Sequence, residues 1–160
     1  MIWIGIIALI VVLPFLLVIF VGAPYVPTFT RDLNDIFKEI QLPSQAVVVD
    51  LGSGDGRLLL IAAKKGYTAV GYEINPILWA ISLLRLRKYP NAHTYLKSLW
   101  KADVAQADLV FTFLNKIYAS KLEKKLLAEM KPGSYFSSFG FAYGNLELIK
   151  KHRANHIYKF

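Results

Sequence analysis

Hydrophobic positions divide the chain into an apolar start and an alternating remainder. Residues 1–30 contain no charged side chain, and residues 2–22 form an apolar run that only Pro14 interrupts. About 20 apolar residues at a helical rise of about 1.5 Å match a hydrocarbon core of about 30 Å. We therefore expect residues 1–22 to form an uncleaved transmembrane anchor, with a signal peptide or a buried core helix as the alternatives.

The residues that flank this run predict its orientation. Trp3 and Tyr25 fall near its two ends, where aromatic rings favour the membrane interface. Lysine and arginine occur only after it, so the positive-inside rule predicts a single-pass membrane protein whose following domain lies on the cytoplasmic side.

Residues 23–45 connect the expected anchor to the rest of the chain. Two prolines stiffen an extended segment, which is either a plain linker or, through Tyr25 and Thr28, a cover for a binding site. Over residues 30–40 the apolar side chains recur at helical spacing and predict a short amphipathic helix.

Strand-like and helix-like segments alternate through residues 46–160. This alternation predicts an α/β domain with a doubly wound, mostly parallel sheet and right-handed crossovers. Ligands of such sheets bind beyond the carboxyl ends of the strands. The expected strands are 46–51, 68–72, 93–97, 108–114 and 134–139, the expected helices are 57–65, 75–88 and 120–130, and the tail at 146–160 is expected to form a β-hairpin.

The composition limits the classes of possible binding partner but does not select one class. The formal net charge of +8 falls entirely on residues 31–160, which suits an anionic membrane, an acidic protein or nucleic acid. The absence of cysteine excludes disulfides and thiolate chemistry. The three histidines share no metal-ligand spacing, so we expect no metal site.

A glycine-rich loop follows the first expected strand. Residues 47–56 read Val-Val-Val-Asp-Leu-Gly-Ser-Gly-Asp-Gly. Glycine permits positive φ and leaves no Cβ in the path of a ligand. The helix N-terminus after the loop favours a negatively charged group. We therefore expect a small, polar and partly anionic ligand here.

The spacing of the glycines distinguishes between kinds of loop. A dinucleotide fingerprint needs glycine where Arg57 stands, and a P-loop needs a Gly-Lys-Ser/Thr ending that is missing. The remaining Asp-x-Gly-x-Gly-x-Gly pattern, which begins at Asp50, resembles motif I of the seven-strand S-adenosylmethionine-dependent methyltransferases. A purely structural strand-to-helix turn is the alternative.

Motif I implies further cofactor-binding residues. Glu73 ends the second strand, 23 positions after Asp50, where an acid can accept both hydroxyls of a ribose. In the methyltransferase pattern, Asp103 lies near the adenine amine and Asp50 faces the methionyl ammonium. A solvated acid at Glu73 and a loop-capping aspartate at Asp50 are the alternatives. Asn75, which is also the expected cap of the next helix, completes the expected cofactor contacts with the backbone of Gly52, Ser53, Gly54 and Gly56.

Four segments together resemble a narrower family. Residues 22–28, 50–57, 71–76 and 99–103 are similar to the small membrane-anchored lysine methyltransferases, whose mitochondrial members modify the adenine nucleotide translocase and the c subunit of ATP synthase. The resemblance implies a class I methyltransferase fold with strand order 3-2-1-4-5-7-6, S-adenosylmethionine as cofactor and methyl transfer to a lysine ε-amine. The short tail and compact size resemble a prokaryotic relative, so the family does not imply the substrate of this chain. For a membrane-anchored lysine methyltransferase, we expect a membrane-embedded or membrane-proximal protein substrate.

The chemistry of methyl transfer to an amine assigns the remaining residues. Catalysis positions a neutral amine in line with an already activated methyl group and excludes water. Residues 113–116 read Phe-Leu-Asn-Lys where other amino methyltransferases carry Asn/Asp-Pro-Pro-Tyr, which argues against nucleic-acid methylation and leaves no obvious general base. Asn115 and Tyr25 are the expected catalytic residues: Asn115 orients the amine or caps its loop, and Tyr25 closes, with Thr28, over the cofactor. The alternatives are a methyltransferase of a lipid-soluble small molecule and a non-catalytic cofactor-binding membrane module.

Overall fold

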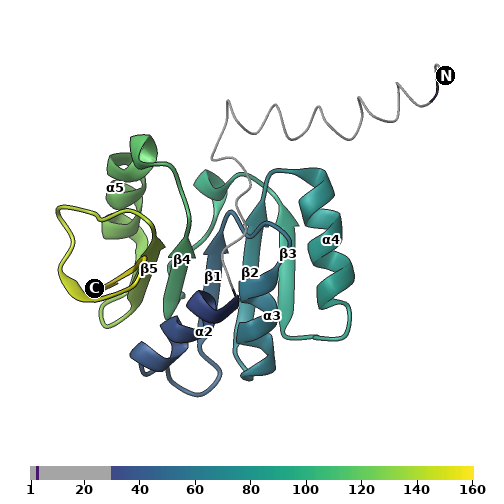
Figure 1. Cartoon of the computed structure of the whole chain (residues 1–160), viewed down its shortest axis with the longest axis horizontal. Helices are drawn as coiled ribbons and strands as arrows, with labels where there is room; N and C mark the ends of the chain where they lie inside the picture. The colour runs from purple at the N-terminus through teal and green to yellow at the C-terminus, as the bar shows by residue number, and fades with distance from the viewer. Residues whose placement is uncertain (1–2, 4–29) are drawn as a thin grey trace.

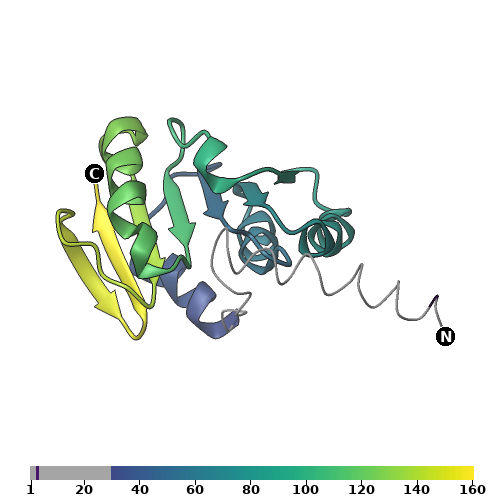
Figure 2. The same cartoon turned by 90° about the horizontal axis from the view of Figure 1, so that it is seen from above.

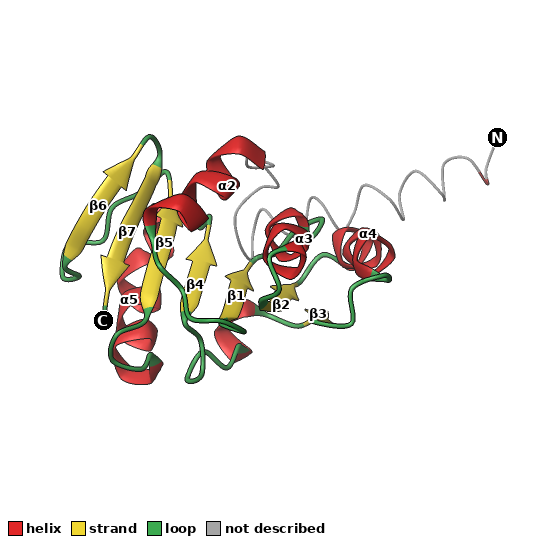
Figure 3. Ribbon diagram, turned by 90° about the horizontal axis from the view of Figure 1, so that it is seen from below, coloured by secondary structure: helices red, strands yellow, loops and turns green. Residues whose placement is uncertain are grey.

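A seven-stranded sheet runs through residues 47–159 of the computed structural model, which describes residue 3 and residues 30–160. The strand order is β3-β2-β1-β4-β5-β7-β6, as the family resemblance implies. β7 runs antiparallel to β5 and β6, and the other neighbouring strands are parallel. Figure 1 labels β1 (Val47–Leu51), β2 (Thr68–Glu73), β3 (Ala92–Leu96), β4 (Leu109–Thr112) and β5 (Tyr135–Phe139), and Figure 3 also labels β6 (Leu148–His152) and β7 (Asn155–Lys159).

The helices cover the two faces of the sheet unequally. Three helices lie on one face and one lies on the other, where it runs alongside the C-terminal strands (Figures 2 and 3). A short 3₁₀-helix follows β3, and a second one follows β4. The first face carries α2 (Thr30–Glu39), α3 (Arg57–Lys64) and α4 (Pro76–Leu86), the second carries α5 (Ala119–Glu129), and the 3₁₀-helices are η1 (Leu99–Lys101) and η2 (Lys116–Tyr118).

The alternation of side chains along β1 places the first functional residue. Val48 joins the apolar core that includes α2 and α3, whereas Val49 joins the core that includes α5. Successive side chains of a strand point to opposite faces. Asp50 therefore lies on the face of Val48, so the strand delivers its carboxylate to the side that α3 covers.

The C-terminal hairpin fixes α2 through polar contacts. Arg153 Nη1 lies 3.1 Å from Asp32 Oδ1, and His152 Nδ1 lies 3.2 Å from Glu39 Oε1. Asn155 Nδ2 donates a hydrogen bond of 2.9 Å to the backbone oxygen of Asp32. The predicted hairpin is thus confirmed, and it docks α2 as well as completing the sheet.

Most element boundaries lie close to those expected from the sequence, and the fourth strand is the main exception. A strand was expected over 108–114, but β4 ends at Thr112. Asn115 Oδ1 accepts a hydrogen bond of 3.1 Å from Ile117 N and caps η2. This local side-chain bond offers the backbone an alternative to the sheet, so the chain turns away early.

The expected anchor and linker fall on residues 1–29, of which the structure describes only Trp3. Within the described part of the chain, no helix is long and apolar enough to span a bilayer. The transmembrane anchor at residues 1–22 therefore stays a prediction.

Candidate cofactor and acceptor site

The glycine-rich loop is held in place by hydrogen bonds to β2. Gly52, Gly54 and Gly56 have φ values of +91°, +54° and +79°, so all three adopt the left-handed conformations that the sequence predicted. Gly52 N and Ser53 N both donate to the backbone oxygen of Tyr72, at 2.9 and 3.0 Å. Gly56 N donates to Ser53 O at 2.9 Å. These amides already donate hydrogen bonds within the protein. The loop therefore contributes open space to a ligand site and few free N–H donors.

The glycines of this region serve two different purposes. A Cβ atom added to Gly52 would meet nothing within 4 Å, which leaves open space against the backbone. A Cβ on Gly56 would stand 2.3 Å from Ser82 Oγ, and one on Gly71 would stand 2.4 Å from Leu59 Cδ1. Gly52 therefore keeps a surface clear for a ligand, whereas Gly56 and Gly71 allow close packing of the loop, α4 and β2.

Asp50 is a buried carboxylate without a partner among the residues that the structure describes. Its exposed fraction is 4 %, and no hydrogen bond or ion pair from residues 30–160 reaches it. Burial raises the pKa of Asp50 well above its usual range, and the nearby carboxylates of Glu73 and Asp55 raise it further. A cationic ligand group would relieve this unfavourable environment. The methionyl ammonium of S-adenosylmethionine fits that requirement.

Glu73 is buried and ties the loop to the start of α4. Its Oε2 accepts a hydrogen bond of 2.7 Å from Gly54 N, and its Oε1 accepts bonds of 2.8 and 2.7 Å from Ile74 N and Asn75 N. The alternative of a solvated acid is wrong, because the exposed fraction is 6 %. A carboxylate has about four acceptor positions, so three amide bonds leave room for a ribose hydroxyl, and that contact stays a prediction.

Asn75 and Ser53 bring further polar groups to the same edge. Asn75 Oδ1 caps α4 by accepting from Ile77 N at 2.9 Å and Leu78 N at 3.3 Å, which confirms the predicted cap. Asn75 Nδ2 and Ser53 Oγ are buried, and neither has a hydrogen-bond partner in the described chain. Unsatisfied buried polar atoms are costly, so both are candidates for contact with a bound ligand.

Asp103 lies at the surface between η1 and β4. Its backbone N donates to Tyr72 Oη at 3.3 Å, which connects this turn to the end of β2. Its Oδ1 accepts a hydrogen bond of 3.0 Å from Ala105 N. The side chain therefore stabilises its own turn here, and contact with an adenine amine stays a prediction.

The acceptor side of the site has an aromatic pair that the sequence did not single out. Phe113 follows β4 and Phe139 ends β5, and their ring centroids lie 5.1 Å apart at 74°. Phe111 belongs to the core that includes Val48, and Phe139 packs against the same core. Through its contact with Phe139, Phe113 lies beside the core that includes Val48, on the face of the sheet to which Asp50 also belongs. Two phenylalanines at the ends of neighbouring strands were the available signal, but only the sheet register shows that they meet.

Of the two expected catalytic residues, Asn115 lies in the described part of the chain and Tyr25 does not. Asn115 Oδ1 has the loop-capping role that was one of its two alternatives. The residue follows the carboxyl end of β4, two positions after Phe113 in the sequence. Tyr25 and Thr28 lie outside the described residues, and their predicted closure over the cofactor remains a prediction.

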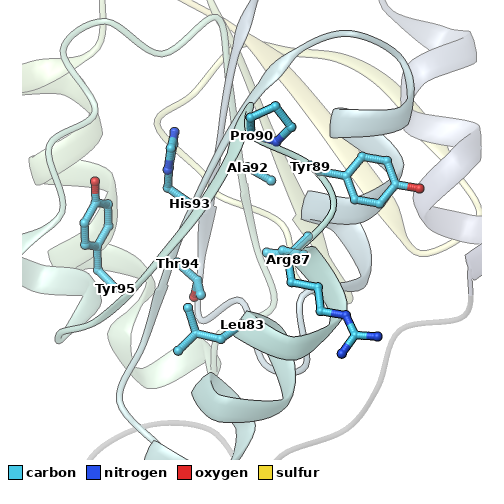
Figure 4. A pocket seen from close by; sticks show the side chains of 9 residues that line it. Leu83, Arg87, Tyr89, Pro90, Ala92, His93, Thr94 and Tyr95 are labelled. Atoms are coloured by element: carbon cyan, nitrogen blue, oxygen red, sulfur yellow. The ribbon is translucent and has the colours of Figure 1, made fainter.

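A shallow pocket of about 300 Å³ lies elsewhere, between the end of α4 and β3. In Figure 4, Leu83 and Arg87 come from the end of α4, and the side chains of His93 and Tyr95 project from β3 away from that helix. The lining side chains do not converge on one point, and none belongs to the glycine-rich loop. We therefore place the cofactor at the loop and not in this pocket.

Solved structures define the class of protein to which this site belongs. An RNA methyltransferase from Salinibacter ruber, in complex with S-adenosyl-L-homocysteine, matches with a TM-score of 0.75 and 25% identity and covers 84% of this chain and 92% of its own. The chain has the class I methyltransferase fold, and the cofactor expected from motif I, S-adenosylmethionine, is that of this class.

Sequence comparison then identifies the family. Residues 50–150 match the ANTKMT methyltransferase domain, and the chain belongs to this family. The Xenopus laevis lysine N-methyltransferase of the ATP synthase c subunit is 35% identical over 125 residues, which are 76% of this chain and 55% of the relative. A protein-lysine N-methyltransferase of Saccharolobus islandicus is 32% identical over 123 residues, 74% of this chain and 76% of that protein. The chain spans about half the length of the Xenopus relative. The resemblance read from the four sequence segments is confirmed, including similarity to a prokaryotic protein.

Proposed function

We propose that this protein is an S-adenosylmethionine-dependent protein-lysine N-methyltransferase that acts on a membrane-embedded or membrane-proximal protein. The observation that carries the proposal is the buried carboxylate of Asp50, which no group of residues 30–160 pairs, beside the open backbone of Gly52. A buried acid needs a cation, and the glycine surface leaves space for the rest of the cofactor. Family membership supplies the reaction type.

The residues in and around the glycine-rich loop would each bind a different group of the cofactor. Asp50 would accept hydrogen bonds from its ammonium, and Glu73 would accept one from its ribose while it keeps the loop in place. Asn75 Nδ2 and Ser53 Oγ would gain the partners that they lack. When bound, S-adenosylmethionine supplies a sulfonium methyl group that needs no acid catalyst.

The remaining task of the protein is to present a neutral amine. A free lysine has a pKa of about 10.4, so fewer than about one amine in 1,000 is neutral at pH 7. Phe113 and Phe139 provide an apolar wall, and desolvation of an ammonium lowers its pKa. Asn115, two positions after Phe113 in the sequence, would orient the amine through its side-chain amide. No titratable base is required if the proton leaves to water before the amine enters.

The nature of the substrate rests on the relatives and on the expected anchor. The relatives are named for the ATP synthase c subunit and for the adenine nucleotide translocase. An anchor at residues 1–22, with the domain on the cytoplasmic side, would hold the site close to such proteins. The Salinibacter protein is an RNA methyltransferase, whereas residues 113–116 of this chain lack the motif expected for base methylation.

Labelling of host membranes tests the reaction and its alternatives together. The full chain is incubated with cofactor labelled in the methyl group, host membranes and host RNA, and label is measured in protein, organic extract and RNA. Protein label that is recovered as methyl-lysine is the expected result. Label in the organic extract would favour a lipid-soluble small molecule, and label in RNA would contradict the proposal.

Matched variants connect the label to the site. Asp50→Asn should abolish the protein label. Glu147→Gln, at an exposed position far in sequence from the glycine-rich loop, should preserve it. Cofactor binding by calorimetry without any label in the three fractions would indicate the non-catalytic binding module.

A further inference from the structure

Helix α4 is apolar on its exposed side as well as on its buried side, where Leu78 and Leu86 lie. Among its eleven residues only Ser82 and Arg85 are polar. Ser82 is completely buried, and Arg85 Nη1 turns inward to pair with Asp55 Oδ2 at 2.8 Å. Leu84, in contrast, is 66 % exposed. A surface helix of a soluble domain exposes polar side chains instead, and a helix that is apolar all round normally lies in a core or against lipid.

The neighbouring strand extends this apolar surface. α4 packs along β3, and Trp79 Nε1 donates a hydrogen bond of 3.2 Å to Thr94 O. Of the ten exposed large apolar side chains within residues 30–160, six fall between residues 74 and 96. We call this surface the α4 face and define it by Ile74, Ile81, Leu83, Leu84 and Leu96, because Tyr95 projects to the opposite side of β3 and contacts Tyr72.

The charges around the α4 face have one sign. Residues 74–102 contain five lysines and arginines and no aspartate or glutamate. One of the five is Arg85, which Asp55 neutralises. The other four are exposed and have no ion-pair partner anywhere in residues 30–160. They are Arg87, Lys88, Lys97 and Lys101.

We propose that the α4 face docks the domain on the surface of an anionic lipid bilayer. Exposed aliphatic side chains with a rim of uncompensated lysine and arginine are what interfacial helices present to acidic headgroups. A single-stranded RNA surface would instead use aromatic rings for stacking, and Ile81, Leu83 and Leu84 cannot stack on bases. A second copy would bring Arg87 and Lys88 of both copies to one interface without an acid to pair them.

The position of the α4 face in the fold agrees with this occupant. α2, α3 and α4 share one face of the sheet (Figure 3). The expected anchor ends at residue 22, and the seven residues to Thr30 can span at most about 25 Å. α4 also begins directly after Glu73, so docking would bring the carboxyl edge of β2 and its cofactor loop near the headgroups. The proposal does not depend on methyl transfer.

A pair of single-cysteine variants tests the docking directly. The chain has no cysteine, so Leu84→Cys on α4 and Leu127→Cys on α5 each carry one environment-sensitive dye at an exposed leucine position. The full chain is reconstituted in vesicles of phosphatidylcholine alone or with an equal part of phosphatidylglycerol. We expect a blue shift and quenching by spin-labelled acyl chains at position 84 in the anionic vesicles, and neither at position 127. Equal behaviour of the two positions would overturn the proposal.

Charge reversal separates docking from anchoring. Arg87→Glu with Lys88→Glu should reduce the quenching at position 84 several-fold in anionic vesicles. Lys124→Glu with Lys151→Glu, which changes the net charge equally at two other exposed positions, should leave it unchanged. Unchanged quenching in both pairs would overturn the proposal. A spectral shift at position 84 on addition of RNA to the detergent-solubilised protein, with none in vesicles, would overturn it in favour of a nucleic-acid surface.

Discussion

Two groups of acids in this protein have opposite electrostatic settings. Asp50 and Glu73 lie buried around the glycine-rich loop, and Asp50 has no cation beside it. Asp32 and Glu39 on α2 each face a basic side chain of the C-terminal hairpin. The second group is compensated within the fold and serves docking of α2. The first group leaves unfavourable charge at one point, which identifies where a cationic ligand group belongs.

Asp50→Asn should produce the largest effect on ligand binding. Loss of a buried charge partner costs about 2–5 kcal/mol, so we expect cofactor affinity to fall by about 30-fold or more. The free protein should not lose stability, because the substitution removes a desolvated acid that faces other carboxylates. Calorimetry and denaturant unfolding measure the two quantities. A large loss of stability with unchanged affinity would mean that Asp50 is structural.

The same residue predicts a pH dependence of the free protein. Because the folded pKa of Asp50 is raised, the folded chain holds a proton that the unfolded chain releases above about pH 4. Its contribution to stability should therefore fall as the pH rises from about 4 to the raised pKa, and Asp50→Asn should lack this component. Saturating cofactor should reduce it in the wild type.

Two glycine substitutions should separate folding from binding. Gly56→Ala combines a φ of +79° with a contact of 2.3 Å to Ser82 Oγ, and we expect a loss of about 2–4 kcal/mol in the free energy of unfolding. Gly52→Ala meets open space, so it should cost only about 1–2 kcal/mol while reducing cofactor affinity. Denaturant titration and calorimetry of both variants test this. Equal effects on stability would contradict the assignment.

Phe113→Ala should affect the reaction through the amine. Loss of the apolar wall beside Phe139 should lower the rate at pH 7 by about 10-fold, because a lysine amine that is better solvated keeps a higher pKa. The pH–rate profile should shift upward, and the free energy of unfolding should fall by about 1–2 kcal/mol. Phe113→Leu, which stays apolar, should retain most of the rate. An unchanged profile in the alanine variant would exclude desolvation as its role.

The sequence predicts the local features of the site better than the contacts that depend on the sheet. The spacing of the glycines predicted their positive φ values and located Asp50 and Glu73, because those features are local. The three amide bonds of Glu73 and the meeting of Phe113 with Phe139 depend on strand register, which local patterns do not contain. Similarly, the run of apolar residues in α4 does not reveal which side faces water until Arg85 is seen to reach Asp55.

Removal of a basic partner from the compensated acids of α2 should have the smallest effect, and that effect should be on stability. The pKa of Glu39 is lowered, mainly by its hydrogen bond with Lys150, so this pair contributes stability above the ordinary glutamate pKa that is lost as the pH falls through the lowered value. Lys150→Gln should lower Tm by a few degrees at neutral pH, and the difference from the wild type should disappear at acid pH, as the pH falls through the lowered pKa of Glu39. Thermal unfolding from neutral to acid pH measures it, with Lys124→Gln as the control. A clear loss of cofactor affinity in Lys150→Gln would show that the two groups of acids are coupled, and that α2 and the hairpin act on the site.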